Sequence, residues 1–182
     1  MSNRAVIVEP FQQEWSQWFA DEKEKLACSL NTSNVAGIHH IGSTSVEGLS
    51  AKPVIDILLE VNCLKTLDSE SGVFRDLGFQ CKGEYGIKNR RFYLKDLNGV
   101  RFCHIHAFPF NSQESHRHLA FRDYLREHPN VRDAYGRIKQ EGAQLHPNDM
   151  EAYISHKAGF IKRYELQAVK WSENVNKGSP VS

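Results

Sequence analysis

The segment that most constrains the fold of this chain spans residues 38–61 and reads IHHIGSTSVEGLSAKPVIDILLEV. Its apolar runs predict one strand ending at Ile41 and a second strand over residues 54–61, joined by a connection rich in small residues. The second run is apolar except for Asp56 and Glu60. Residues at even spacing in a strand share a face, so we expect both carboxylates, with Leu58 between them, on one side of a sheet.

Asp56 is the first candidate for a functional residue. A carboxylate in the middle of an apolar strand is costly to bury without a partner or a metal ion. Contact with a metal or a substrate is one interpretation, and a structural aspartate bound to backbone N–H groups is the other. Lys52, just before Pro53, could reach a phosphate from the preceding loop, although a solvated lysine is the simpler interpretation.

The turn between the two strands is the second candidate. Glycine allows a ligand to approach the backbone closely, and serine and threonine add hydroxyls that suit phosphate oxygens or a metal ion. Taken alone, such a turn more often caps a short helix. The residues concerned are Gly42, Ser43, Thr44 and Ser45.

Composition limits the possible classes of protein. The chain has 182 residues, 40% of them hydrophobic, which predicts one globular domain with a core. The formal net charge of +1 gives no support for non-specific binding to nucleic acid or to a membrane surface. No apolar run approaches the ~20 residues that span a bilayer. Four cysteines without a CxxC pair, and no recognisable secretory signal, favour reduced, mostly packed thiols and a cytoplasmic location.

The remaining patterns predict helices around a small mixed sheet. Helical spacing covers residues 11–30 and 64–77, and a short strand is expected over residues 79–82. Two strand-like arms, residues 90–96 and 100–108, are joined by Asn98-Gly99, a strong hairpin signal. Three helices follow, over residues 113–128, 131–145 and 149 to about 171, the last with Asp149 as its N-cap. We expect a single domain over residues 1–171, with an α/β unit up to about residue 110, a helical lobe over 111–171 and a flexible tail over 172–182.

The second hairpin arm contains His104 and His106, which share a face. Such a pair can bind a metal, accept a proton or hydrogen-bond a phosphate. Two histidines alone do not specify a metal site, and polar residues on a half-exposed sheet face are the alternative. If this arm lies beside the strand carrying Asp56, the three side chains form one catalytic and metal-binding site. Arg90 and Arg91 begin the facing arm, and alternation allows only one of them to share the histidine face.

The predicted helices add cations that could face the same site. Arg122 is one turn before Arg126, and two lysines each follow a tyrosine by one turn: Lys139 after Tyr135, and Lys157 after Tyr153. Exposed helical lysines usually face solvent, so each lysine alone is more often structural than functional.

Four separated motifs resemble those of one known family. They are HHIGSTSVEGLSAKPVIDILLEV, HIHAF, HLAFRDYLREHPNVRDAYGRIKQ and YISHKAGFI, in this order. Over about residues 8–168 the chain resembles the GrpB family, also called UPF0157, an uncharacterised protein family similar in fold to the nucleotidyltransferase superfamily. The resemblance implies an α+β fold with a nucleotidyltransferase-like mixed sheet, flanking helices and a C-terminal helical lobe.

At the expected site the sequence departs from the pattern of the superfamily. The superfamily pattern is a Gly-Ser turn, a strand with two acids and a third acid on a later strand. Gly42 and Ser43 match the turn and Asp56 matches the first acid, whereas Leu58 stands in the place of the second. His104 and His106 stand where the third acid is expected.

Three hypotheses about function follow from the resemblance. In the first, Mg²⁺ (or Mn²⁺) on Asp56, with His104 or His106 as helper, supports nucleotidyl transfer from a nucleoside triphosphate at residues 42–45 to an unknown acceptor. The cations neutralising its phosphates would be Lys52, Arg122, Lys139 and Lys157. One carboxylate provides little negative charge for two metal ions. The second hypothesis is therefore a non-catalytic module that binds a nucleotide or another phosphorylated small molecule. A metal-dependent phosphohydrolase is the third. Base preference and oligomeric state do not follow from the sequence.

Overall fold

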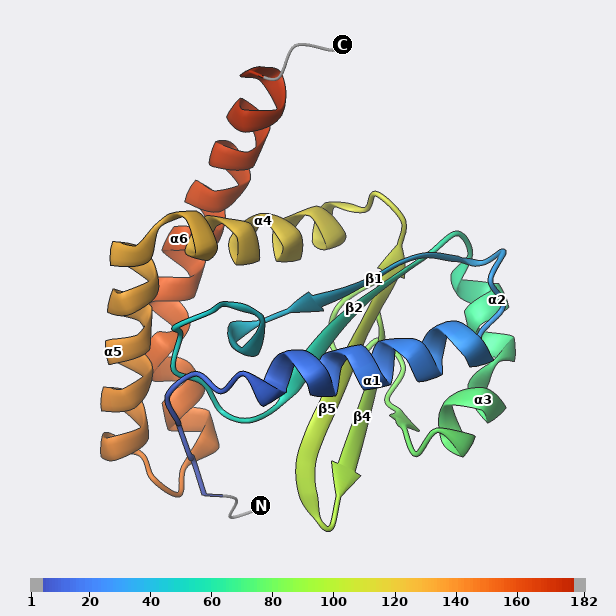
Figure 1. Cartoon of the computed structure of the whole chain (residues 1–182), viewed down its shortest axis with the longest axis horizontal. Coiled ribbons are helices and arrows are strands. Elements are labelled where there is room, and N and C mark those ends of the chain that lie inside the picture. Colours follow the sequence, from blue (N-terminus) through green and yellow to red (C-terminus); the bar gives the residue numbers. More distant parts are fainter. Residues whose placement is uncertain (1–4, 179–182) are drawn as a thin grey trace.

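The computed structural model describes residues 5–178. At its centre is a five-stranded sheet with the order β1-β2-β5-β4-β3 (Figure 1). The parallel pair β2 and β5 lies in the middle, and all other neighbours are antiparallel. The strands are β1 (Val35–Ile41), β2 (Ile55–Val61), β3 (Gln80–Cys81), β4 (Arg91–Leu97) and β5 (Val100–Pro109). The expected α+β class and mixed sheet are confirmed.

The main core lies on the sheet face covered by α1 (Glu14–Ser29), α2 (Leu64–Ser69) and α3 (Ser71–Asp76). Alternate residues of β2 enter this core, so the intervening positions Asp56, Leu58 and Glu60 point to the opposite face. The β2 side chains in the core are Ile55, Ile57, Leu59 and Val61.

The single helix expected over residues 64–77 is wrong, because the chain forms two short helices there. They are interrupted at Glu70, whose φ of −92° and ψ of 14° leave the helical region. Ser69, Ser71 and Gly72 around this position are weak helix formers. The Asn98-Gly99 hairpin is confirmed, with φ values of 51° and 77° at its two turn residues.

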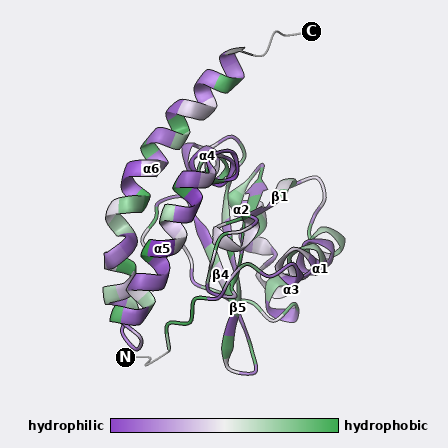
Figure 2. Cartoon of the chain, turned by 60° about the vertical axis from the view of Figure 1, so that its left-hand side comes forward, coloured by the Kyte–Doolittle hydropathy of each residue, from purple (hydrophilic) through white to green (hydrophobic). Residues whose placement is uncertain are grey.

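The opposite face of the sheet meets the C-terminal helices. These are α4 (Gln113–Glu127), α5 (Pro129–Leu145) and α6 (Met150–Gly178). Helix α4 packs against β1, β2, β5 and α6, and α5 packs along α6. Figure 2 shows α5 and α6 side by side at one end of the sheet. Asp149 accepts a hydrogen bond from the Ala152 N–H at 3.0 Å, which confirms the expected N-cap.

Two further expectations differ from the structure. Helix α6 continues to Gly178 instead of ending near Trp171, and residues 179–182 of the expected flexible tail lie outside the described residues. Cys28, Cys63 and Cys81 are exposed and only Cys103 is buried, so the expectation of mostly packed thiols is wrong. The exposed thiols lie on α1, at the start of α2 and on the short edge strand β3.

Within residues 5–178, no helix combines the length and apolarity that crossing a membrane requires.

Candidate functional site

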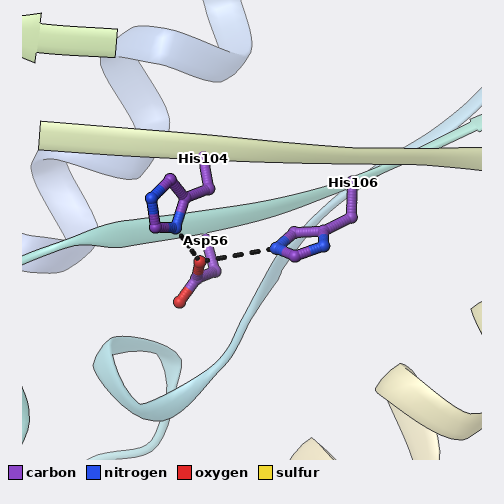
Figure 3. A group of neighbouring side chains, drawn as sticks. All are labelled: Asp56, His104 and His106. Atoms are coloured by element: carbon purple, nitrogen blue, oxygen red, sulfur yellow. Dashed lines mark hydrogen bonds and ion pairs between the residues drawn. The ribbon is translucent and has the colours of Figure 1, made fainter. Parts of the chain in front are cut away.

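The register of the two parallel strands brings one carboxylate and two imidazoles together. Asp56 pairs with His104 across β2 and β5, and Leu58 pairs with His106. Both imidazoles therefore lie on the face that carries Asp56 (Figure 3). Nδ1 of His104 is 2.9 Å from Asp56 Oδ1, and Nε2 of His106 is 3.6 Å from the same oxygen. The structure thus gathers the three side chains predicted as a site, while their role remains a prediction.

This Asp–His–His cluster is accessible from solvent. The exposed fractions of the side chains are 28% for Asp56, 24% for His104 and 16% for His106, so an ion or a phosphate group can reach them. Burial alone would raise the pKa of the Asp56 carboxyl, but hydrogen bonds from both histidines lower this pKa well below its ordinary value. Asp56 is therefore an anion at neutral pH.

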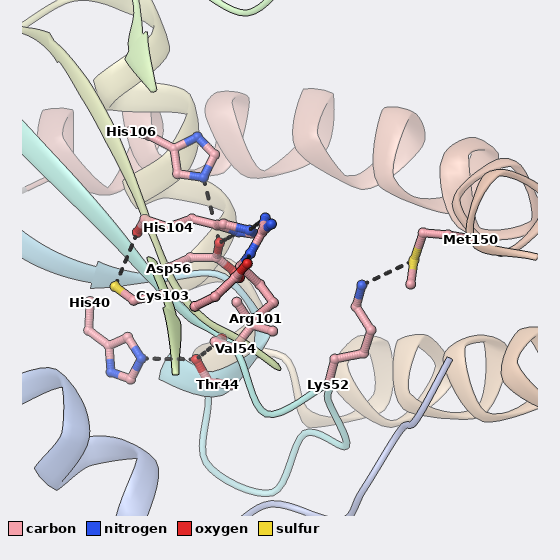
Figure 4. Close-up of polar contacts among 11 residues, drawn as sticks. His40, Thr44, Lys52, Val54, Asp56, Arg101, Cys103, His104, His106 and Met150 are labelled. Carbon is pink, nitrogen blue, oxygen red and sulfur yellow. Dashed lines mark hydrogen bonds and ion pairs between the residues drawn. The ribbon is translucent and has the colours of Figure 1, made fainter. Parts of the chain in front are cut away.

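Arg101 determines which nitrogen of His104 carries the proton. Its Nη1 lies 3.1 Å from His104 Nε2 (Figure 4). Its Nε donates to Asp96 Oδ1 at 2.5 Å. A guanidinium can only donate hydrogen bonds, so His104 Nε2 must accept. The proton of neutral His104 then lies on Nδ1 and is donated to Asp56.

The same three residues fit a divalent metal ion. Their candidate ligand atoms all lie within 4.8 Å of one another, and this is the one such group within residues 5–178. Two imidazoles and one carboxylate suit Mn²⁺, Fe²⁺ or Zn²⁺ better than Mg²⁺, which prefers oxygen ligands. A metal on His104 Nδ1 would take the place of the proton now shared with Asp56. The Nδ1 atom of His106 is buried without a hydrogen-bond partner in the part of the chain that the structure describes, so the usual outer partner of a metal-bound histidine is missing there.

The turn of small residues lies directly against Asp56. Gly42 has φ 70° and ψ −174°, and a Cβ atom there would be 2.6 Å from Asp56 Oδ2. Only glycine permits this backbone conformation and this approach. Residues Ser43–Ser45 form a short 3₁₀ helix.

Two of the three hydroxyls of this turn are bound inside the protein. Thr44 Oγ1 donates to the Val54 carbonyl and lies 3.0 Å from His40 Nε2, and Ser45 Oγ donates to the Gly42 carbonyl. Both side chains are buried. Ser43 forms a side-chain hydrogen bond with Tyr135 of α5, which joins the turn to the helical lobe.

The three predicted arginines are held by local partners. Arg122 donates to the His40 carbonyl and pairs with Asp123. Arg91 pairs with Asp68 of α2, whereas the Arg90 guanidinium lies 4.8 Å from the Phe92 ring centroid. Because Phe92 pairs with His106 across β4 and β5 and its ring contacts both histidines, Arg90 is the arginine on the histidine face.

Of the three predicted lysines, Lys157 lies near both of the others. Lys52 Nζ and Lys157 Nζ lie 5.5 and 4.9 Å from the centroid of the same Tyr153 ring. The charge of Asp56 acts on both of these lysines. Lys139 Nζ lies 4.5 Å from the Tyr135 ring centroid. These three residues are called the lysine cluster below.

Two neighbours of the cluster were not predicted from the sequence. In a regular strand Arg101 and His104 would point to opposite faces, so no contact between them was expected. The register of β4 and β5 shifts at Lys95/Asp96, and this irregularity changes the local alternation. His118 of α4 lies with its ring centroid 5.3 Å from that of His106. Burial lowers the pKa of His118 to about 3, helped by the charges of His106 and Arg117. Its spacing from His116 gave no metal-binding signal.

Glu60, the other acid of β2, is not part of the Asp–His–His cluster. Its Oε2 lies 3.0 Å from His39 Nε2, and its Oε1 accepts from the Asn111 N–H. Leu58, in the place of the second acid, is fully buried with Ile41 and Phe108. The site therefore has one carboxylate.

The fold and the cluster define a small α+β protein with a candidate metal centre on a mixed sheet. The chain belongs to the GrpB family, since the family model described as "GrpB protein" matches residues 5–167. The UPF0157 protein YqkA of Bacillus subtilis is 37% identical over 173 residues, covering 95% of this chain and 50% of YqkA. The chain thus spans half the length of that relative.

Two further relatives are matched over nearly their whole length. The glutamate-rich protein GrpB of Alkalihalophilus pseudofirmus is 30% identical over 160 residues, covering 86% of this chain and 91% of the relative. The crystal structure of the conserved protein GrpB from Enterococcus faecalis superposes with a TM-score of 0.87 at 40% identity, covering 91% of this chain and 99% of that one. None of these names states a reaction or a ligand.

Proposed function

We propose that this GrpB protein is a divalent-metal-dependent enzyme that acts on the phosphate groups of a nucleotide and transfers a nucleotidyl group to an acceptor. The observation that supports the proposal best is the Asp–His–His cluster, with an ionised carboxylate and two imidazoles around one accessible point. The turn at Gly42 borders this point, and the missing side chain there allows the Asp56 carboxylate to lie directly against the turn.

Each residue of the cluster has a definite part in this proposal. Asp56 Oδ1, His104 Nδ1 and His106 Nε2 would hold the ion, which supplies positive charge to the phosphate when bound. Because His104 Nε2 then becomes an N–H donor, Arg101 must release it. Asp96 already accepts from Arg101 Nε and keeps the guanidinium nearby. The ligand set favours Mn²⁺ over the Mg²⁺ expected from the resemblance.

Binding without transfer is the second candidate function. The place of a second acid is occupied by buried Leu58, and Glu60 is bound to His39 and to the Asn111 backbone. A two-ion mechanism uses carboxylates to hold both ions, and only one carboxylate is present. A chain that binds a metal–nucleotide complex without converting it would satisfy the same geometry.

The test is incubation with each nucleoside triphosphate and Mn²⁺ or Mg²⁺, with separate detection of pyrophosphate and inorganic phosphate. Nucleotidyl transfer predicts pyrophosphate release that Asp56→Asn and His106→Gln abolish. His39→Gln is the matched control, because His39 is also a sheet histidine paired with a carboxylate, 32% exposed and outside the cluster.

Other outcomes of this experiment decide against transfer. Release of inorganic phosphate alone would indicate a phosphohydrolase. Metal-dependent stabilisation by a nucleotide without turnover would indicate the binding module. If wild-type protein responds to neither metal nor nucleotide, the proposed function is wrong.

A further inference from the structure

The lysine cluster gathers three amino groups in one part of the protein. Lys52 comes from the loop before β2, Lys139 from α5 and Lys157 from α6, so three separate segments contribute to it. Within residues 5–178, none of these lysines forms a salt bridge with an acidic side chain. Lys52 Nζ donates to the Met150 thioether sulfur at 3.3 Å, a weak acceptor (Figure 4).

Lys139 is the most unusual member of the cluster. Its side chain is 2% exposed, and its Nζ is buried with no hydrogen-bond partner among the described residues. Burial and the neighbouring charge of Lys157 lower the pKa of Lys139 to about 6. Burial and the charge of Lys52 likewise lower the pKa of Lys157 to about 8, against the opposing effect of Asp56. A buried amine of this kind destabilises the protein unless something compensates it.

Lys95, another buried lysine of this protein, is paired with a carboxylate. Lys95 is 9% exposed, and its Nζ donates to both carboxylate oxygens of Glu22 at 3.1 and 2.9 Å. An apolar side chain of similar size would fill the site of Lys139 at lower cost. The uncompensated lysines are therefore better explained by a ligand that brings the missing negative charge.

We propose that the lysine cluster is a polyphosphate subsite that binds the terminal phosphates of the ligand whose other end lies at Asp56. The identity of that ligand as a nucleotide rests on the proposed function. The charge of Asp56 acts on both Lys52 and Lys157, and we place the extended anion between the metal site and these lysines. Tyr135, which hydrogen-bonds Ser43 and lies under Lys139, connects the two ends of the site. A compound with two or more phosphates is the class of ligand that fits.

The test is isothermal titration of inorganic tripolyphosphate into the protein at pH 6.5 with EDTA present, so that no metal contributes. Wild-type protein should bind, and Lys139→Met and Lys157→Met should each weaken binding about tenfold or more, as expected for the loss of a charge-assisted hydrogen bond. Lys162→Met is the matched control, because Lys162 is an exposed lysine on the same helix as Lys157. Inorganic phosphate should bind more weakly than tripolyphosphate.

Two further variants separate the possible outcomes. Lys139→Met should also raise the thermal midpoint, so loss of binding in a more stable protein excludes misfolding as the cause. Asp56→Asn should keep tripolyphosphate binding without metal while it abolishes turnover, so this subsite and the proposed function can fail separately. No binding by wild-type protein, or equal binding by the lysine variants and wild type, would overturn the subsite.

Discussion

Gly42→Ala tests whether the glycine turn and Asp56 form one unit. The backbone at Gly42, with φ 70° and ψ −174°, lies in a region that essentially only glycine adopts, and strain of this kind costs about 1–3 kcal/mol. The new Cβ would also lie 2.6 Å from Asp56 Oδ2, closer than real Cβ contacts come. Either the turn or the carboxylate must therefore move by several tenths of an ångström.

We expect Gly42→Ala to lose stability and to lose most of its affinity for Mn²⁺. The measurements are urea denaturation and titration with Mn²⁺. Each kcal/mol lost corresponds to roughly 2–4 °C in the thermal midpoint at this chain length. Gly99→Ala is the matched control, because Gly99 has φ 77° but no atom within 4 Å of an added Cβ. This control should lose about 1–2 kcal/mol from strain and keep its Mn²⁺ affinity. Unchanged Mn²⁺ affinity in Gly42→Ala would refute the proposed contact between the turn and the metal site.

Further predictions concern charges on and near the sheet. Leu58→Asp adds a second acid to β2 at a fully buried position, so it should destabilise the protein by about 3 kcal/mol or more without producing turnover, as measured by urea denaturation and pyrophosphate release. The unfolded chain binds a proton on Lys139 up to pH ~10.4, whereas the folded pKa is about 6. Wild-type stability should therefore rise with pH between these values, and the advantage of Lys139→Met should shrink over the same range. An advantage independent of pH would contradict the low pKa of Lys139. Neutral His104 keeps its one proton, which should move from Nδ1 to Nε2 when Mn²⁺ binds, so at alkaline pH the heat of binding should not depend on the ionisation enthalpy of the buffer.

Much of the sheet could be predicted from the sequence because its signals are local. Alternation in residues 54–61 indicated which side chains of β2 share a face, and Asn98-Gly99 indicated the hairpin. The pairing of β2 with β5 is a long-range contact, so the approach of His104 to Asp56 could be stated only as a condition. The resemblance to the GrpB family provided that long-range information, and the family assignment is confirmed.

The parts that sequence reasoning missed depend on tertiary structure. The position of Arg101 follows from a register shift that alternation does not reveal. The hydroxyl of Thr44 is bound to partners in β1 and in the loop before β2, and that of Ser45 to the Gly42 carbonyl within the turn. The lysines of α5 and α6 look like ordinary surface residues in the sequence, and only the packing of the lobe buries Lys139 beside Lys157 and brings Lys157 within reach of the Asp56 charge.

The most direct test of the account is electron paramagnetic resonance of Mn²⁺ added to the wild-type protein, to Asp56→Asn and to His39→Gln. A single site on Asp56, His104 and His106 predicts one bound Mn²⁺ per chain, with hyperfine coupling to imidazole nitrogen. The signal should be lost in Asp56→Asn and retained in His39→Gln. Absence of nitrogen coupling in the wild-type protein, or equal binding by Asp56→Asn, would contradict the metal centre.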